Sequence, residues 1–113
     1  MFYMQSCFDL KEGERREGFS TALKAFDRHL RDLDLVVTTA PLGRRVRHPV
    51  MDTDEVRGQA WCFLMTFRDH GQCDRAVAHF QSGDPTTDRL HGAVHGKIEN
   101  YVFFCWEDDT GGE

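Results

Sequence analysis

The stretch QAWCFLMTFRDHGQCDRAVAHF, residues 59–80, contains a strand pattern followed directly by a helix pattern. Over residues 61–67 large apolar side chains occupy every second position, which predicts a strand with one strongly apolar face. Asp69 and Gln72 then form a capping-box-like pair at the start of a helix. The apolar side chains that follow recur at helical spacing: Cys73, Ala76, Val77 and Phe80. The stretch therefore predicts a strand that runs straight into an amphipathic helix.

The segments before this stretch predict a strand, a helix and a second strand. FYMQSCFD, residues 2–9, alternates between an apolar face and a mixed face, as a strand does. From Glu14 onward the period changes to three or four residues for about five turns, which predicts an amphipathic helix. Its apolar stripe contains Phe19, Leu23, Phe26, Leu30 and Leu33. Residues 36–39 favour a strand that Pro41 and Gly43 interrupt, and residues 48–58 are typical of a long loop.

The segments after it predict a short helix and a last strand. Asp84 can cap a helix that has Pro85 at its first position. NYVFFCWED, residues 100–108, is strand-like and apolar on both faces, and residues 109–113 are expected to be disordered. The main elements follow the order βαββαβ, which predicts an α+β, ferredoxin-like fold with a four-stranded antiparallel sheet and its helices on one face. We expect residues 1–108 to form a single domain.

The last two predicted strands are apolar on the face that the helices do not cover. An antiparallel sheet with one wet face should alternate apolar and polar side chains, yet both strands are apolar on both sides, so Leu64 and Phe104 cannot both share the helix side with Phe63 and Phe103. An apolar outer face would be a large exposed patch unless something covered it. A second copy of the chain is the simplest cover, so the sequence predicts a homodimer through the sheet faces.

Composition excludes several classes of partner. The 113 residues include 14 basic and 19 acidic side chains, for a net charge of −5, which argues against a nucleic-acid partner because phosphate binding needs clustered positive charge. No apolar stretch approaches the ~20 residues needed to span a bilayer, and the first residues lack the basic start of a signal peptide. We therefore expect a cytoplasmic protein without a membrane partner.

The chain resembles the dimeric α+β barrel superfamily in pattern and order. The likeness rests on FYMQSCFDLKEG running into a helix, on WCFLMTFRDHGQCDRA and on the closing NYVFFCWED, and it covers about residues 2–107. More narrowly, the chain resembles an uncharacterised bacterial family within that superfamily. The superfamily includes cofactor-free monooxygenases that act on quinol-like aromatics, haem-degrading enzymes and lactone isomerases. The resemblance implies a ligand cleft between helices and sheet in each protomer.

RLHGAVHG, residues 89–96, raises the question of a metal site. His91 and His95 lie four residues apart and would share one face of a helix, but a metal site needs a third ligand, for which Asp88 and Glu99 are candidates. Two glycines weaken this helix, which is therefore expected to end before His95 and to leave the histidines at its edge. The sequence thus predicts no metal and no cofactor, with a site on the two histidines as the alternative.

A ligand site is predicted in the cleft between helices and sheet. His29 lies at the margin of the first helix's apolar stripe, and His48 ends the basic segment GRRVRH, residues 43–48. An imidazole can serve as a base near neutral pH, so His29 and His48 are the predicted catalytic residues. Arg44 would hold an anionic group, and Tyr3 and Trp61 would line the cleft. The alternative for the basic segment is an edge strand guarded by charge.

Three functions remain open from the sequence. The first is binding or transformation of a small apolar or aromatic molecule, possibly an acidic one, without metal and in a monooxygenase- or isomerase-like manner. The second is a non-catalytic homodimer that regulates or scaffolds, because no paired acid–base motif is present. The third is a metal-dependent enzyme that uses His91 and His95. The sequence does not decide whether the protein is an enzyme.

Overall fold

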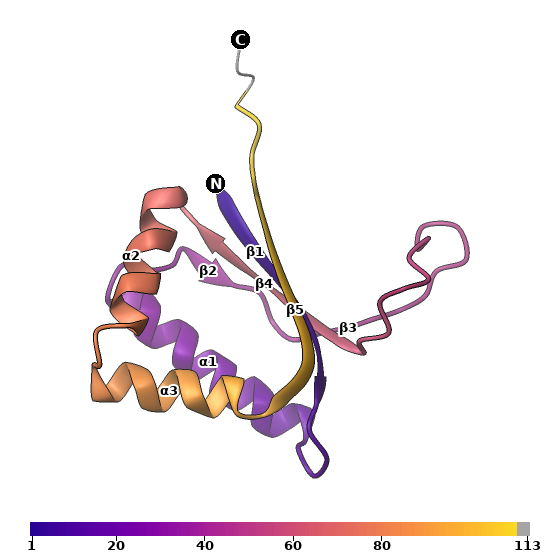
Figure 1. The fold of residues 1–113 in the computed structure, drawn as a ribbon, viewed down its shortest axis with the longest axis horizontal. Helices are drawn as coiled ribbons and strands as arrows, with labels where there is room; N and C mark the ends of the chain where they lie inside the picture. Colours follow the sequence, from indigo (N-terminus) through magenta and orange to yellow (C-terminus); the bar gives the residue numbers. More distant parts are fainter. Residues whose placement is uncertain (111–113) are drawn as a thin grey trace.

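Three helices pack on one side of an antiparallel sheet (Figure 1). The computed structural model describes residues 1–110, so most of the predicted disordered tail, residues 111–113, lies outside the described residues. The elements in chain order are β1 (Phe2–Leu10), α1 (Arg16–Asp32), β2 (Thr38–Thr39), β3 (Gly43–Arg44), β4 (Trp61–Phe67), α2 (His70–Phe80), α3 (Pro85–His95) and β5 (Ile98–Glu107). No helix within residues 1–110 is long and apolar enough to cross a membrane.

The strands follow the order β2-β4-β1-β5, and β3 also pairs with β4. All pairings are antiparallel, with β1 in the middle between β4 and β5. This arrangement confirms the predicted α+β, ferredoxin-like fold, including the passage of β4 directly into α2. The predicted cap of α2 is also present, because the backbone N–H of Gln72 donates to Asp69 Oδ1 at 2.7 Å.

Strands β2 and β3 are the two halves of the predicted second strand. Thr38 lies opposite Thr66 and Gly43 lies opposite Cys62, so the chain advances five residues on one side and four on the other. The extra residue is a bulge at the Pro41 break. A Cβ at Gly43 would lie 3.2 Å from Cys62 Sγ, so only glycine lets the two strands approach here without a shift.

The core lies between the helices and the sheet. Phe8 of β1, Phe19 of α1 and Phe63 of β4 are buried together, with ring centroids 5.0 Å apart for Phe8 and Phe19 and 5.7 Å apart for Phe8 and Phe63. The predicted stripe of α1 is buried through Leu30, but Leu33 is 43% exposed because the helix ends at Asp32. The apolar pattern of the sequence therefore placed the core correctly up to the end of α1.

The outer face of the sheet carries no helix and is apolar along β5. Register places Phe104 beside Gln5 and Trp106 beside Tyr3, while Phe103 lies opposite Ser6 on the helix side. Phe104 and Trp106 are 41% and 42% exposed. The Trp106 ring stacks on Tyr3, with centroids 5.2 Å apart. The protomer thus exposes large aromatic side chains on the face that the sequence predicted to be covered by a second copy.

Candidate functional site

A cavity of about 270 Å³ lies between the helices and the sheet. Side chains of β1, β4 and β5 form its floor, and side chains of α1, α2 and α3 form its walls. Nine of its twelve lining side chains are apolar, among them Phe26, Phe63, Phe80 and Phe103. The cavity lies in the cleft where the sequence predicted a ligand site.

Ser6 supplies the first polar group of this helix–sheet cavity. Strand alternation turns its side chain toward the helices, and the residue is fully buried. Its hydroxyl has no hydrogen-bond partner in the described protein. Leaving a buried hydroxyl unpaired costs about 1–3 kcal/mol, so a polar group that fills this cavity would relieve an existing penalty.

His91 and His95 supply the other two polar groups. Their rings stack nearly parallel, with centroids 5.6 Å apart, and the His91 ring also stacks on Phe80 at 5.3 Å. Burial, with the neighbouring His95, lowers the pKa of His91 from its ordinary value of 6.5. The imidazole of His91 is therefore neutral at neutral pH and can either accept or donate a proton.

The prediction that α3 ends before His95 is wrong. The helix continues through Gly92 to His95, and both rings face the same side. Val94 is buried and Leu90 packs against the core, so tertiary packing outweighs the low helix propensity of glycine. Neither Asp88 nor Glu99 joins the pair in a group of three metal-ligating atoms within the described residues, so the alternative metal site on His91 and His95 lacks a third ligand.

His29 lies outside the helix–sheet cavity, contrary to the predicted placement. Its Nε2 lies 2.7 Å from the hydroxyl of Thr87, the buried residue in the first turn of α3. His79 Nε2 lies 2.8 Å from the same hydroxyl, which also donates to Asp84 Oδ2 at 2.7 Å. The packing of three helices thus assembles a polar cluster that no spacing in the sequence indicated.

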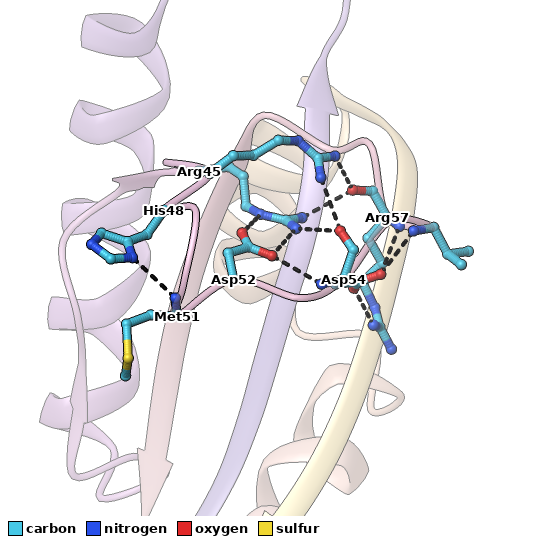
Figure 2. A network of polar contacts seen from close by, with 8 residues as sticks. Arg45, His48, Met51, Asp52, Asp54 and Arg57 are labelled. Carbon is cyan, nitrogen blue, oxygen red and sulfur yellow. Dashed lines mark hydrogen bonds and ion pairs between the residues drawn. The ribbon is translucent and has the colours of Figure 1, made fainter.

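The predicted basic segment braces a long loop, which we call the arm (residues 45–60). Figure 2 shows how Arg45 turns back onto the arm, where its guanidinium donates to both carboxylate oxygens of Asp52 at 2.7 and 2.9 Å. The same side chain and Arg47 donate to the carbonyl of Asp54. Arg45 holds the pKa of Asp52 below its ordinary 3.8, so this ion pair persists as pH falls and is lost only at pH values below that ordinary pKa.

His48 also has a structural role within the arm. Its Nδ1 accepts a hydrogen bond from the backbone N–H of Met51 at 3.0 Å (Figure 2). The backbone N–H of Val50 donates to the same nitrogen at 3.1 Å. It lines an open cavity on the outer face that contains Phe104, whereas His29 belongs to the helix cluster. The structure therefore does not bring the two predicted catalytic histidines together.

Replacing Arg45 by alanine should open the arm to proteolysis. A glutamate-specific protease can cut there after Glu55, and the variant should be cut about tenfold faster, since local opening becomes easier when a charge-assisted hydrogen-bond pair is lost. The cleavage rate followed by mass spectrometry measures this. Arg44→Ala, which changes the neighbouring residue on the other side of the strand, serves as the control. Equal rates for both variants would contradict the bracing role of Arg45.

The three predicted substrate-binding residues lie in two places. Arg44 and Trp61 face α1, where they line a surface cavity of about 580 Å³ together with Lys24. Tyr3 lies on the outer face, where its hydroxyl donates to the carboxylate of Asp108 at 3.0 Å. The pKa of Tyr3 is raised by this hydrogen bond, so its phenol stays protonated. None of the three lines the helix–sheet cavity.

Several solved structures have the same fold, and the similarity covers nearly the whole chain. The crystal structure of At3g17210 from Arabidopsis thaliana is 12% identical, with a TM-score of 0.72 and 97% of each chain covered. SnoaB, described as a cofactor-independent oxygenase from Streptomyces nogalater, is 12% identical, with a TM-score of 0.66 over 99% of this chain and 97% of its own. A dimeric ferredoxin-like protein of unknown function from Jannaschia sp. CCS1 is 19% identical, with a TM-score of 0.59 over 95% and 98%.

These likenesses bear out the ferredoxin-like fold and the resemblance to dimeric α+β barrels, but at such identities they carry no activity. Comparison with curated proteins gave no match. The model of a family of unknown function, DUF6614, matches residues 1–108, and the chain belongs to that family.

Proposed function

We propose that this protein is a homodimer whose protomers each bind a small aromatic molecule with a phenolic or similar polar group in the helix–sheet cavity. The observation that carries the proposal is the buried, unpartnered hydroxyl of Ser6 in a cavity that is otherwise almost entirely apolar. Ligand pockets are mostly apolar with a few placed polar groups, and this cavity has that composition.

The size of the cavity limits the ligand to one or two rings. Its volume of about 270 Å³ lies just below the ~300–1,000 Å³ that ligand pockets occupy. Phe26, Phe80 and Phe103 offer ring faces and edges to a flat molecule. A phenolic hydroxyl could then pair with Ser6 or His91 while the rings stay among apolar side chains.

Proton transfer is the chemistry that the proposed site could perform. The imidazole of His91 is neutral at neutral pH, so it can accept the proton of a phenol and leave a phenolate among mostly apolar side chains. An electron-rich phenolate is the reactive form for oxygenation or isomerisation of an aromatic compound. The description of SnoaB as a cofactor-independent oxygenase supports a search for chemistry that protein side chains carry alone.

The homodimer completes the proposal. The exposed aromatic side chains of the outer face require cover, and solved structures with this fold are described as dimeric proteins. The arm adds further apolar side chains that are largely exposed in the protomer, including Val50, Met51 and Val56. The outer face and the arm together would form the contact with a second copy.

Titration with 2-naphthol tests the proposed site. We expect saturable binding at one molecule per protomer, measured by calorimetry and by the naphthol's fluorescence. Ser6→Ala should weaken binding about three- to tenfold, the effect of one hydrogen bond, without loss of protein stability, because it removes an unpaired hydroxyl. Ser82→Ala, a change on an exposed turn, is the matched control and should bind like the parent protein.

Two further measurements complete the test. Val94→Phe places a ring in the cavity and should abolish binding in a variant whose circular dichroism shows a folded protein. Binding should persist below pH 6.5, because the pKa of His91 lies below that value, and should weaken once the imidazole is protonated. If 2-naphthol does not bind, or if Val94→Phe binds it normally, the cavity is not the site, and the non-catalytic homodimer becomes the better function.

A further inference from the structure

We propose that His29, His79 and Asp84 form a binding site for a divalent transition-metal ion of the zinc or cobalt class. The three residues come from α1, α2 and the residue that caps α3. One ligand atom from each, an imidazole nitrogen from either histidine and a carboxylate oxygen, lies within 4.8 Å of the other two. This site is separate from the helix–sheet cavity, so it neither rests on nor supports the proposed function.

The donor set suits this class of metal. Two imidazoles and one carboxylate are borderline ligands of the kind that zinc and cobalt take, and three protein ligands leave a fourth position for water. Hydrogen bonds from the hydroxyl and backbone N–H of Thr87 lower the pKa of Asp84, so its carboxylate is ionised. Within residues 1–110 no lysine or arginine forms an ion pair with Asp84, so no resident cation competes for the site.

The three donor atoms, which lie within 4.8 Å of one another, must move closer together around an ion. Zinc bonds of about 2.0–2.2 Å place tetrahedral donor atoms about 3.3 Å apart. His79 Nε2 and Asp84 Oδ2 are already 3.7 Å apart. The His79 and Asp84 side chains are 28% and 38% exposed, so an ion can reach them from solvent.

Thr87 would serve as the support of the metal site. Its hydroxyl donates to Asp84 Oδ2 at 2.7 Å, which fixes the carboxylate as outer-shell partners of metal ligands usually do. In the metal-free chain the same hydroxyl can accept from both Nε2–H groups, since a hydroxyl offers two acceptor positions. Metal binding would replace these two hydrogen bonds with coordination by the same nitrogen atoms.

Cobalt titration of the chelator-treated, tag-free protein tests the proposal. We expect the visible bands of tetrahedral cobalt to saturate at one ion per protomer, without the sulfur charge-transfer bands that cysteine ligation would give. Calorimetry with zinc should give the same stoichiometry, and zinc should raise the melting temperature because it binds only the folded chain.

The variants separate a metal site from a hydrogen-bonded hub. Asp84→Asn keeps a good helix cap, and His79→Gln keeps a polar side chain, yet each should weaken cobalt binding at least about 100-fold. His70→Gln is the matched control, because His70 lies 3.5 Å from Asp74 in an exposed pair without a second histidine. The proposal is overturned if the parent protein shows no tetrahedral bands, or if its cobalt binding survives either His79→Gln or Asp84→Asn.

Discussion

Leu64→Asp or Phe104→Asp should convert the homodimer to monomers, with the dissociation constant of the dimer raised by at least about 100-fold. Both side chains lie on the outer face of the sheet, on β4 and β5, and flank Gln5 of β1 in register. A carboxylate buried there against a second sheet costs several kcal/mol. At position 104 the Arg57 guanidinium, which lies 5.4 Å from the centroid of the Phe104 ring, offsets part of that cost, so Leu64→Asp should have the larger effect. Sedimentation equilibrium at a series of protein concentrations measures the change.

Leu33→Asp provides a control of matched chemistry. Leu33 is 43% exposed, much like Phe104 at 41%, but it lies at the end of α1 on the opposite side of the sheet. It should leave the dimer intact. A parent protein that sediments as a monomer at micromolar concentration would contradict the homodimer, and a Leu33→Asp variant that dissociates equally would show that the outer face is not the interface.

Phe19→Ala should destabilise the protein by about 3–5 kcal/mol, as expected for a fully buried phenylalanine. Its ring packs on Phe8 and Phe63 and joins α1 to both central strands, so truncation leaves a cavity that rigid neighbours cannot fill. Urea denaturation followed by circular dichroism measures the free energy of unfolding.

Val46→Ala removes an apolar side chain of the arm that is 73% exposed and should change the unfolding free energy by less than about 0.5 kcal/mol in the isolated protomer. To keep the dimer equilibrium out of the measurement, both variants are best compared in a Phe104→Asp background. Equal losses for Phe19→Ala and Val46→Ala would mean that the buried aromatic cluster does not form the core.

The fold could be predicted because each main element carries its own local signal. Alternation over residues 61–67 predicted β4, the Asp69–Gln72 pair predicted the start of α2, and Asp84 with Pro85 predicted α3. Each of these signals depends on residues that are close together in the sequence, so the sequence alone is enough to predict the element. The predicted end of α3 was wrong because Val94 is buried by packing against other elements, which the local sequence does not show.

The sites were harder to predict because they depend on distant residues. The sequence indicated the cleft but not the role of Ser6. That role depends on a buried hydroxyl without a hydrogen-bond partner, which is apparent only in the folded chain. The cluster of His29, His79 and Asp84 forms only when three helices pack together. These residues are 50 and 5 positions apart in the sequence, and such spacings do not indicate a shared site. The sequence did indicate the ion pairs of the arm, because acidic residues follow the arginines closely enough to pair with them, as Asp52 does with Arg45.

The bulge between β2 and β3 makes this strand tolerant of one particular change in chain length. A related chain with one residue fewer within 40–42 can pair regularly with β4 and still place its counterparts of Thr38 and Gly43 opposite Thr66 and Cys62. One residue fewer within 61–67 would instead turn the following side chains of β4 to the opposite face. When members of this family are aligned, a single-residue gap therefore belongs at Ala40–Leu42. A deletion there shortens the chain, and the side chains of the sheet that face the core still face the core.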